Sequence, residues 1–211
     1  MMHQEDDLRG KEGYFIAAAL FAGVVALGFA VMAGFGHALD VELFGKLALR
    51  KNLSPDWAIA AARWASWIGD GERRTLITIG LALWFVWERR FKAALIIAVV
   101  PTLGVVVSSA LKEAFARPRP HLSPHLDGVY DFAFPSGHSA FGGVFLFAAL
   151  LLPGKNPRLR IALALIAAGC IGFSRPMLGV HWPSDVIGGW LMGLSIAIAS
   201  VTLVRNWEGS K

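Results

Sequence analysis

Six long apolar stretches, separated by short charged segments, constrain this chain more than any other feature. A membrane-spanning helix needs about 20 mostly apolar residues, so six of them take up most of the 211 residues. The composition agrees, because 55% of the residues are hydrophobic and only 17% are charged, against about 45–50% and about 25% in soluble domains. We therefore expect an all-α polytopic membrane protein, a six-transmembrane-helix bundle in a single domain of residues 1–211, with spans at 14–34, 75–87, 93–111, 139–152, 161–173 and 186–204.

The distribution of positive charge predicts the orientation in the membrane. Six spans put both termini on one side, and the 20 Lys and Arg residues divide equally between the two sides. Their density differs, because three cations lie within 89–92 and three within 155–160, both on the side of the termini. Short cytoplasmic loops are enriched in Lys and Arg, so we expect cytoplasmic termini and a bacterial inner (plasma) membrane. The first stretch exceeds the apolar region of about 7–15 residues of a signal peptide and is expected to remain as a span.

The segment 37–74 mixes apolar residues with charges and does not fit a simple linker. Trp57, Trp64 and Trp67 recur in it, and tryptophan is enriched at membrane interfaces. The pattern predicts one or two short amphipathic helices at the outer membrane surface. An alternative of equal weight is that these residues pack over the loop side of the bundle.

Three polar clusters lie in the second half of the chain, and the alternating topology puts all three on the outer, periplasmic side. The first runs from Lys112 to Pro120, at the end of the third stretch. Pro118 and Pro120 are expected to end the helix near Ala116, so that Arg119 turns back over the helix end. Alone, this cluster also fits cations that reach from the membrane boundary to water.

The second cluster is Pro135-Ser136-Gly137-His138, immediately before the fourth stretch. Serine and glycine at a helix start offer a hydroxyl group and unpaired backbone N–H groups, which together favour an anion. The alternative is a simple helix N-cap with His138 in contact with solvent.

The third cluster runs from Ser174-Arg175 through His181 to Asp185. Pro183 suits the first position of a helix, and the spacing of four residues lets Asp185 reach one imidazole nitrogen of His181. A carboxylate there fixes the tautomer and leaves the other nitrogen free to attack. The alternative is a structural His–Asp pair at a helix start.

Together the three clusters are more specific than any one alone, because ionisable groups near lipid are costly and usually functional. Their residues match a phosphoryl-transfer site, in which His181 attacks phosphorus, Asp185 supports it and His138 protonates the departing oxygen. The groups expected to bind the phosphoryl oxygens are Lys112, Arg119, Ser136, Gly137 and Arg175.

These clusters resemble the signature of the type 2 phosphatidic acid phosphatase family, which shares its core with vanadium haloperoxidases. The family pattern is Lys-x6-Arg-Pro, Pro-Ser-Gly-His and Ser-Arg-x5-His-x3-Asp, and all three parts occur without departure within 112–185. The resemblance implies a six-helix membrane phosphatase, without metal or other cofactor, that works through a phosphohistidine on His181 with His138 as the acid. The substrates it implies are phosphorylated lipids: phosphatidate, phosphatidylglycerophosphate, isoprenyl diphosphates such as undecaprenyl diphosphate, or lipid A phosphates.

A membrane transporter or channel for an anionic solute or lipid is the alternative from another class, because a cationic mouth over a helix bundle suits it. It does not explain a His–Asp pair facing a second histidine, and no inverted repeat relates the two halves of the sequence. A haloperoxidase-like oxidation with bound vanadate is a second alternative. The predicted membrane spans argue against it, since the relatives with that chemistry are soluble.

Other phosphate chemistries fit the spacing less well. Four residues separate Cys170 from Arg175, one fewer than a cysteine-phosphatase loop requires, and no G-x-x-x-x-G-K-[ST] loop occurs. Two-metal hydrolysis would depend on a few loop residues as ligands. Those residues are His121, His125, Asp127 and Asp131.

The segment 122–134 is expected to be a flexible loop that closes over the lipid head group, where Asp127 and Asp131 tune specificity. The basic pI near 9.7 does not indicate nucleic-acid binding, because the cations serve the topology and the site. The sequence carries no signal for an oligomeric state.

Overall fold

Eight α-helices make up the chain, and the computed structural model describes residues 2–153 and 155–209. Within these ranges there is no strand, which agrees with the expected all-α class. The predicted single domain of residues 1–211 includes four positions that lie outside the described residues: 1, 154, 210 and 211. The helices are α1 (Met2–Met32), α2 (His37–Leu47), α3 (Asp56–Ile68), α4 (Gly71–Trp87), α5 (Phe91–Phe115), α6 (Gly137–Leu151), α7 (Pro157–Met177) and α8 (Pro183–Gly209).

Four of these helices are long and apolar enough to cross a membrane, namely Lys11–Met32 within α1 and the whole of α5, α7 and α8. The other two predicted stretches fall on shorter helices, because α4 has 17 residues and α6 has 15. At the rise of an α-helix these two reach about 23–26 Å, against a hydrocarbon thickness of about 30 Å. The chain is an integral membrane protein of all-α class, and the count of six spans stays a prediction.

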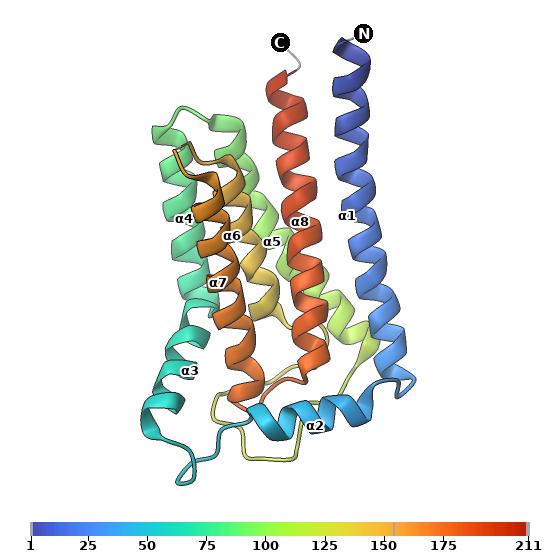
Figure 1. Ribbon diagram of the computed structural model, residues 1–211, viewed down its shortest axis with the longest axis vertical. Coiled ribbons are helices and arrows are strands. Elements are labelled where there is room, and N and C mark those ends of the chain that lie inside the picture. Colours follow the sequence, from blue (N-terminus) through green and yellow to red (C-terminus); the bar gives the residue numbers. More distant parts are fainter. Residues whose placement is uncertain (1, 154, 210–211) are drawn as a thin grey trace.

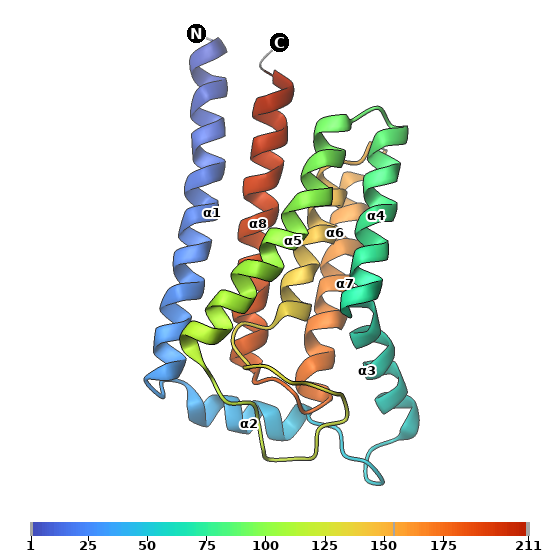
Figure 2. The same ribbon diagram turned by 180° about the vertical axis from the view of Figure 1, so that it is seen from behind.

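Six helices run side by side in one bundle, namely α1, α4, α5, α6, α7 and α8 (Figures 1 and 2). Within it, α1 packs against α8, and α8 packs against α6. α1 begins and α8 ends at the same end of the bundle. The opposite end carries α2, which lies across it, and the loops that follow α5 and α7. The three polar clusters of the sequence therefore meet at one end, away from the helix ends that lead to the termini.

Glycines bring α6 and α8 into backbone contact near this end. A Cβ on Gly143 would meet the backbone of Gly193, and a Cβ on Gly193 would meet the backbone of Ala140. One turn closer to the site, a Cβ on Gly189 would meet the carbonyl of Ser136. Small residues allow such close approach between membrane helices, so they fix the start of α6 against the start of α8.

The core of the bundle lies on both sides of this contact. Phe85, Ile97, Phe147 and Val204 belong to one buried cluster, built from α4, α5, α6 and α8. A second cluster joins α1 to the region near the site through Val24, Phe115, Phe134 and Met192.

The segment 37–74 forms two short helices, α2 and α3, as the sequence predicts. α2 buries Phe44 against Trp182, and α3 buries Ala62 against Val180, so both helices pack on the connection that leads into α8. The tryptophans of α3 face outward instead, as an interfacial position requires. These exposed side chains are Trp57, Trp64 and Trp67.

Candidate active site

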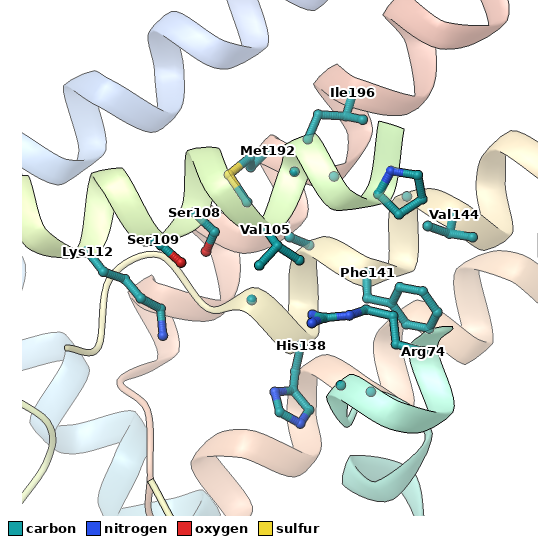
Figure 3. Close-up of a pocket in the computed structure, with 18 of the residues that line it drawn as sticks. Arg74, Val105, Ser108, Ser109, Lys112, His138, Phe141, Val144, Met192 and Ile196 are labelled. Carbon is teal, nitrogen blue, oxygen red and sulfur yellow. The ribbon is translucent and has the colours of Figure 1, made fainter. Parts of the chain in front are cut away.

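A cavity of about 500 Å³ lies between α4, α5, α6 and α8, beside the end of α7. His138, Lys112 and Arg74 point into it from three different helices (Figure 3). The predicted site residues that line it are Lys112, Arg119, Gly137, His138, Arg175 and His181. The rest of the wall is largely apolar and continues into the bundle along Val100, Val105, Phe141, Val144, Met192 and Ile196.

His181 and Asp185 form the pair that the spacing predicts, and both side chains are buried. The Nδ1 of His181 lies 3.4 Å from Oδ2 of Asp185, and the two atoms form no hydrogen bond in this geometry. The backbone N–H of Trp182 donates to the same carboxylate oxygen at 2.8 Å and so fixes it. Pro183 is the first residue of α8, as predicted, and this helix start carries Asp185 back toward the imidazole.

The other nitrogen of His181 faces the cationic part of the site. Its Nε2 lies 3.1 Å from Nη1 of Arg119. Burial lowers the pKa of His181 well below its ordinary value of 6.5, and the positive charges of Arg119 and Arg175 lower it further. The imidazole is therefore neutral at neutral pH, which is the form that can attack an electrophile.

Arg119 sits where the sequence predicts, beyond the end of α5. That helix ends at Phe115, and Ala116 follows in the left-handed conformation with φ 43°. The chain then turns, and backbone carbonyl oxygens hold the guanidinium of Arg119. Its Nε donates to the carbonyl of Asp131 at 2.7 Å and its Nη1 to that of Val180 at 2.6 Å.

Carboxylates of the segment 122–134 pair with all three predicted phosphate-binding cations. Asp131 accepts from Nζ of Lys112 and from Nη2 of Arg119, each at 2.5 Å. Asp127 accepts from Nη1 of Arg175 at 2.5 Å. Burial alone would raise the pKa of each carboxyl, but these cations outweigh it and hold the pKa of both Asp127 and Asp131 below the ordinary value.

Arg175 keeps one donor free within the described part of the chain. Its side chain is 2% exposed, and its Nη1 also donates to the hydroxyl of Ser66 on α3. Among the described residues, none accepts a hydrogen bond from its buried Nε. A buried guanidinium with an unused donor at the wall of a cavity suits an anionic ligand.

The start of α6 shows the N-cap that the sequence predicts. The Oγ of Ser136 accepts from the backbone N–H of Ser139 at 3.4 Å and from its hydroxyl at 3.0 Å. Gly137 and His138 line the cavity, whereas Ser136 is fully buried beside it. A role for the Ser136 hydroxyl in phosphate binding stays a prediction.

His138 meets a partner that the sequence analysis did not assign to the site. Its Nε2 lies 3.1 Å from Oδ1 of Asp70, the residue before α4. The ring also rests on Gly69, where a Cβ would come within 2.6 Å of Cδ2 of His138. Burial and the nearby charge of Asp127 raise the pKa of Asp70.

Comparison with known families decides which family the chain belongs to. The family model of the PAP2 superfamily matches residues 92–208, which is more than half of the chain. The chain belongs to the PAP2 superfamily. The match begins just inside α5, ends within α8 and includes all three clusters, so the resemblance to type 2 phosphatidic acid phosphatases is confirmed.

Two curated PAP2-like relatives are an undecaprenyl-diphosphatase of Sulfolobus acidocaldarius and a phosphatidylglycerophosphatase B of Bacillus subtilis. The first is 30% identical over 129 residues and the second 32% identical over 126 residues. These matches take in 58% and 56% of this chain, and they span about three fifths of the length of each relative, 60% and 61%.

The crystal structure of a transmembrane PAP2-type phosphatidylglycerolphosphate phosphatase from Bacillus subtilis has the same fold. Its TM-score is 0.79 at 24% sequence identity, over 92% of this chain and 96% of that one. A second structural neighbour, LpxE of Aquifex aeolicus, aligns with a TM-score of 0.62 at 25% identity, over 77% of this chain and 94% of that chain.

Arg117 is the buried residue of this PAP2 site that sequence reasoning missed. Its Nη1 donates to Asp185 and, at 2.7 Å, to Ser184, while its Nη2 donates to Asp40 of α2 at 2.7 Å. Neither Arg117 nor Asp40 stands among the site residues that the sequence predicts. The proximity of Arg117 to Arg119 was the available signal, but nothing local pairs it with α2.

The residues of the two-metal alternative are engaged elsewhere in this PAP2 fold. Asp127 and Asp131 pair with cations, and the rings of His121 and His125 stack on each other at 6.2 Å between centroids. Across residues 11–153 and 155–209, no group of three His, Cys, Asp or Glu side chains is arranged to hold a metal ion. Metal independence stays a prediction. Cys170, the residue of the cysteine-phosphatase alternative, is exposed on α7.

Proposed function

We propose that this PAP2 protein is a lipid phosphatase that hydrolyses a phosphomonoester or diphosphate of a membrane lipid. The observation that carries this proposal is the cavity. Two histidines and three cations line one end of it, and apolar side chains line the part that extends into the bundle. A lipid with a terminal phosphate has the same two parts. The two curated relatives, an undecaprenyl-diphosphatase and a phosphatidylglycerophosphatase B, support this substrate class.

The first chemical step is attack of His181 on phosphorus. The Nε2 lone pair forms the P–N bond while the P–O bond to the lipid breaks, and His138 gives a proton to the departing oxygen. The carboxylate of Asp185, 3.4 Å from Nδ1, stabilises the positive charge that develops on the imidazole. The products of this step are the dephosphorylated lipid and a phosphohistidine.

The second step is hydrolysis of the phosphohistidine by water. His138, now neutral, takes a proton from the water as its oxygen attacks phosphorus, and the P–N bond breaks with its electrons returning to Nε2 of His181. Inorganic phosphate leaves, and both histidines regain their starting states. The residues that stabilise negative charge on the phosphoryl oxygens in both steps are Lys112, Arg119, Arg175, Ser136 and the backbone N–H of Gly137.

The membrane arrangement is part of the same proposal. α4 and α6 cross the membrane with the four longer helices, which gives six spans with both termini on the cytoplasmic side. The cation-rich loops at 89–92 and 155–160 then face the cytoplasm. The cavity opens at the periplasmic surface of a bacterial inner membrane. Cysteines placed one at a time at the exposed loop positions Arg89 and Leu122, in a chain whose Cys170 is replaced by alanine, test the orientation when they are labelled from either side.

The deciding experiment is a phosphate-release assay with the purified full chain in detergent. The panel contains phosphatidate, phosphatidylglycerophosphate, undecaprenyl diphosphate and a lipid A phosphate, with His181→Ala as the blank. We expect release from at least one lipid, unchanged by EDTA, and none with His181→Ala. Absence of release from every lipid overturns the proposal, and flux of an anion across protein-containing liposomes would then favour the transporter alternative.

A further inference from the structure

The three cations proposed to bind phosphate already have anionic partners from the loop after α5. Asp131 bridges Lys112 and Arg119, with both N–O distances at 2.5 Å. Asp127 holds Arg175 at 2.5 Å. The carboxylate oxygens of the loop therefore occupy the hydrogen-bond donors that phosphoryl oxygens need.

The two sides of these ion pairs differ in burial. The side chains of Lys112, Arg119 and Arg175 are 10%, 8% and 2% exposed, whereas those of Asp131 and Asp127 are 54% and 34% exposed. A half-exposed carboxylate can turn into water at low cost, but a buried cation left without an anion is unfavourable. The carboxylates are the exchangeable partners, and the cations are the fixed ones.

Arg119 stays in position without the carboxylate of Asp131. The backbone carbonyls of Asp131 and Val180 accept from its Nε and Nη1, and the carbonyl of Phe132 accepts from its Nη2 at 3.2 Å. The side chain of Asp131 therefore adds charge to this site more than it adds geometry.

The charges also match. A phosphomonoester carries close to two negative charges at neutral pH, because its second pKa is about 6. Asp131 and Asp127 together carry two, since both are ionised when their pKa values are held low. Exchange of the two carboxylates for one phosphoryl group leaves the net charge around the three cations unchanged.

We propose that Asp131 and Asp127 are internal competitors of the phosphoryl group, which occupy its cations before substrate binds and displace inorganic phosphate after hydrolysis. This inference rests on the proposed lipid phosphatase function. It assigns to the loop a part in product release, because phosphate held by three buried cations would otherwise leave slowly. Asp131, which bridges two cations and is more exposed, carries the larger share.

The test is the equilibrium binding of inorganic phosphate to the purified full chain in detergent at pH 7.5, measured by calorimetry. We expect Asp131→Asn to bind phosphate about tenfold more tightly than the wild type, because it removes a competing carboxylate that accepts from two cations. Asp127→Asn should tighten binding about threefold, because Asp127 pairs with a single cation. The matched control is Glu113→Gln, which removes the same charge from an exposed position outside these ion pairs and should not change binding.

A purely structural role of Asp131 predicts the opposite sign, because loss of a positioning carboxylate would weaken phosphate binding. Weaker or unchanged binding in both Asp131→Asn and Asp131→Ala overturns the inference. It is also overturned if neither the wild type nor any variant binds phosphate. Asp131→Glu restores a carboxylate and should restore the weaker binding of the wild type. In the release assay, added phosphate should inhibit Asp131→Asn at lower concentration than the wild type.

The two proposals fail separately. Binding of phosphate needs no turnover, so it can be measured even where no lipid is hydrolysed. Lipid hydrolysis without tighter binding in the variants overturns the inference alone, and tighter binding without hydrolysis of any lipid overturns the proposed function.

Discussion

The two halves of the site are built differently. On the nucleophile side, His181, Asp185, Arg117 and Asp40 are all buried. Arg117 pairs with both carboxylates, and the backbone N–H of Trp182 fixes Asp185 beside the imidazole of His181. On the cation side, buried Lys112, Arg119 and Arg175 face carboxylates that are open to water. The imidazole of His181, which must keep one orientation, is buried among fixed partners. The cations, which must bind and release a ligand, are paired with carboxylates that can turn into water.

The largest expected effect is at the nucleophile. His181→Ala removes the attacking nitrogen and should reduce phosphate release by about 10³-fold or more. The control is His121→Ala, which removes an exposed histidine of the neighbouring loop and should retain activity. Near-full activity of His181→Ala would show that His181 is not the nucleophile.

The stability of the two sides should differ as well. Arg117→Gln leaves the buried carboxylates of Asp185 and Asp40 without their cation, so the free energy of unfolding should fall by about 3–5 kcal/mol. Asp131→Asn also leaves buried cations without their anion, but Asp131 is 54% exposed and three backbone carbonyls still hold Arg119, so the loss should be smaller, about 1–2 kcal/mol. Thermal or denaturant unfolding in detergent measures both, and equal losses would contradict the distinction between the two sides.

The contact that holds α6 against α8 should be sensitive to a single methyl group. Gly193→Ala puts a Cβ against the backbone of Ala140 and should destabilise the protein by about 1–3 kcal/mol. Gly169→Ala on α7 is the matched control, because a Cβ there meets open space and alanine favours helix by about 0.5–1 kcal/mol. If both variants unfold alike, the close approach of α6 and α8 is not what fixes the start of α6 against the start of α8.

The smallest effect concerns pH. His181 attacks as the neutral base, and because its pKa is lowered, the neutral form persists as pH falls below 6.5. The acid limb of the kcat/KM profile should therefore lie below the usual range of histidine. A rate that is flat from about pH 4 to 10 would contradict two histidines in opposite roles.

Much of this structure follows from short-range patterns in the sequence. Apolar length predicts the six long helices, the two prolines after Ala116 predict the end of α5, and Ser136 and Pro183 predict the starts of α6 and α8. The site clusters are equally local, because each motif fits within a few turns of chain. Alternating topology then brings all three clusters to one end without any knowledge of the packing.

Only the tertiary structure decided which charges are partners. Asp40 meets Arg117, Asp70 meets His138, and Asp131 bridges Lys112 and Arg119. A helix cap or an i,i+4 pair is set by the geometry of one segment, so sequence alone determines it. An ion pair between distant segments depends on how the helices pack, and here the α6–α8 contact and the position of α2 across the bundle end set that arrangement.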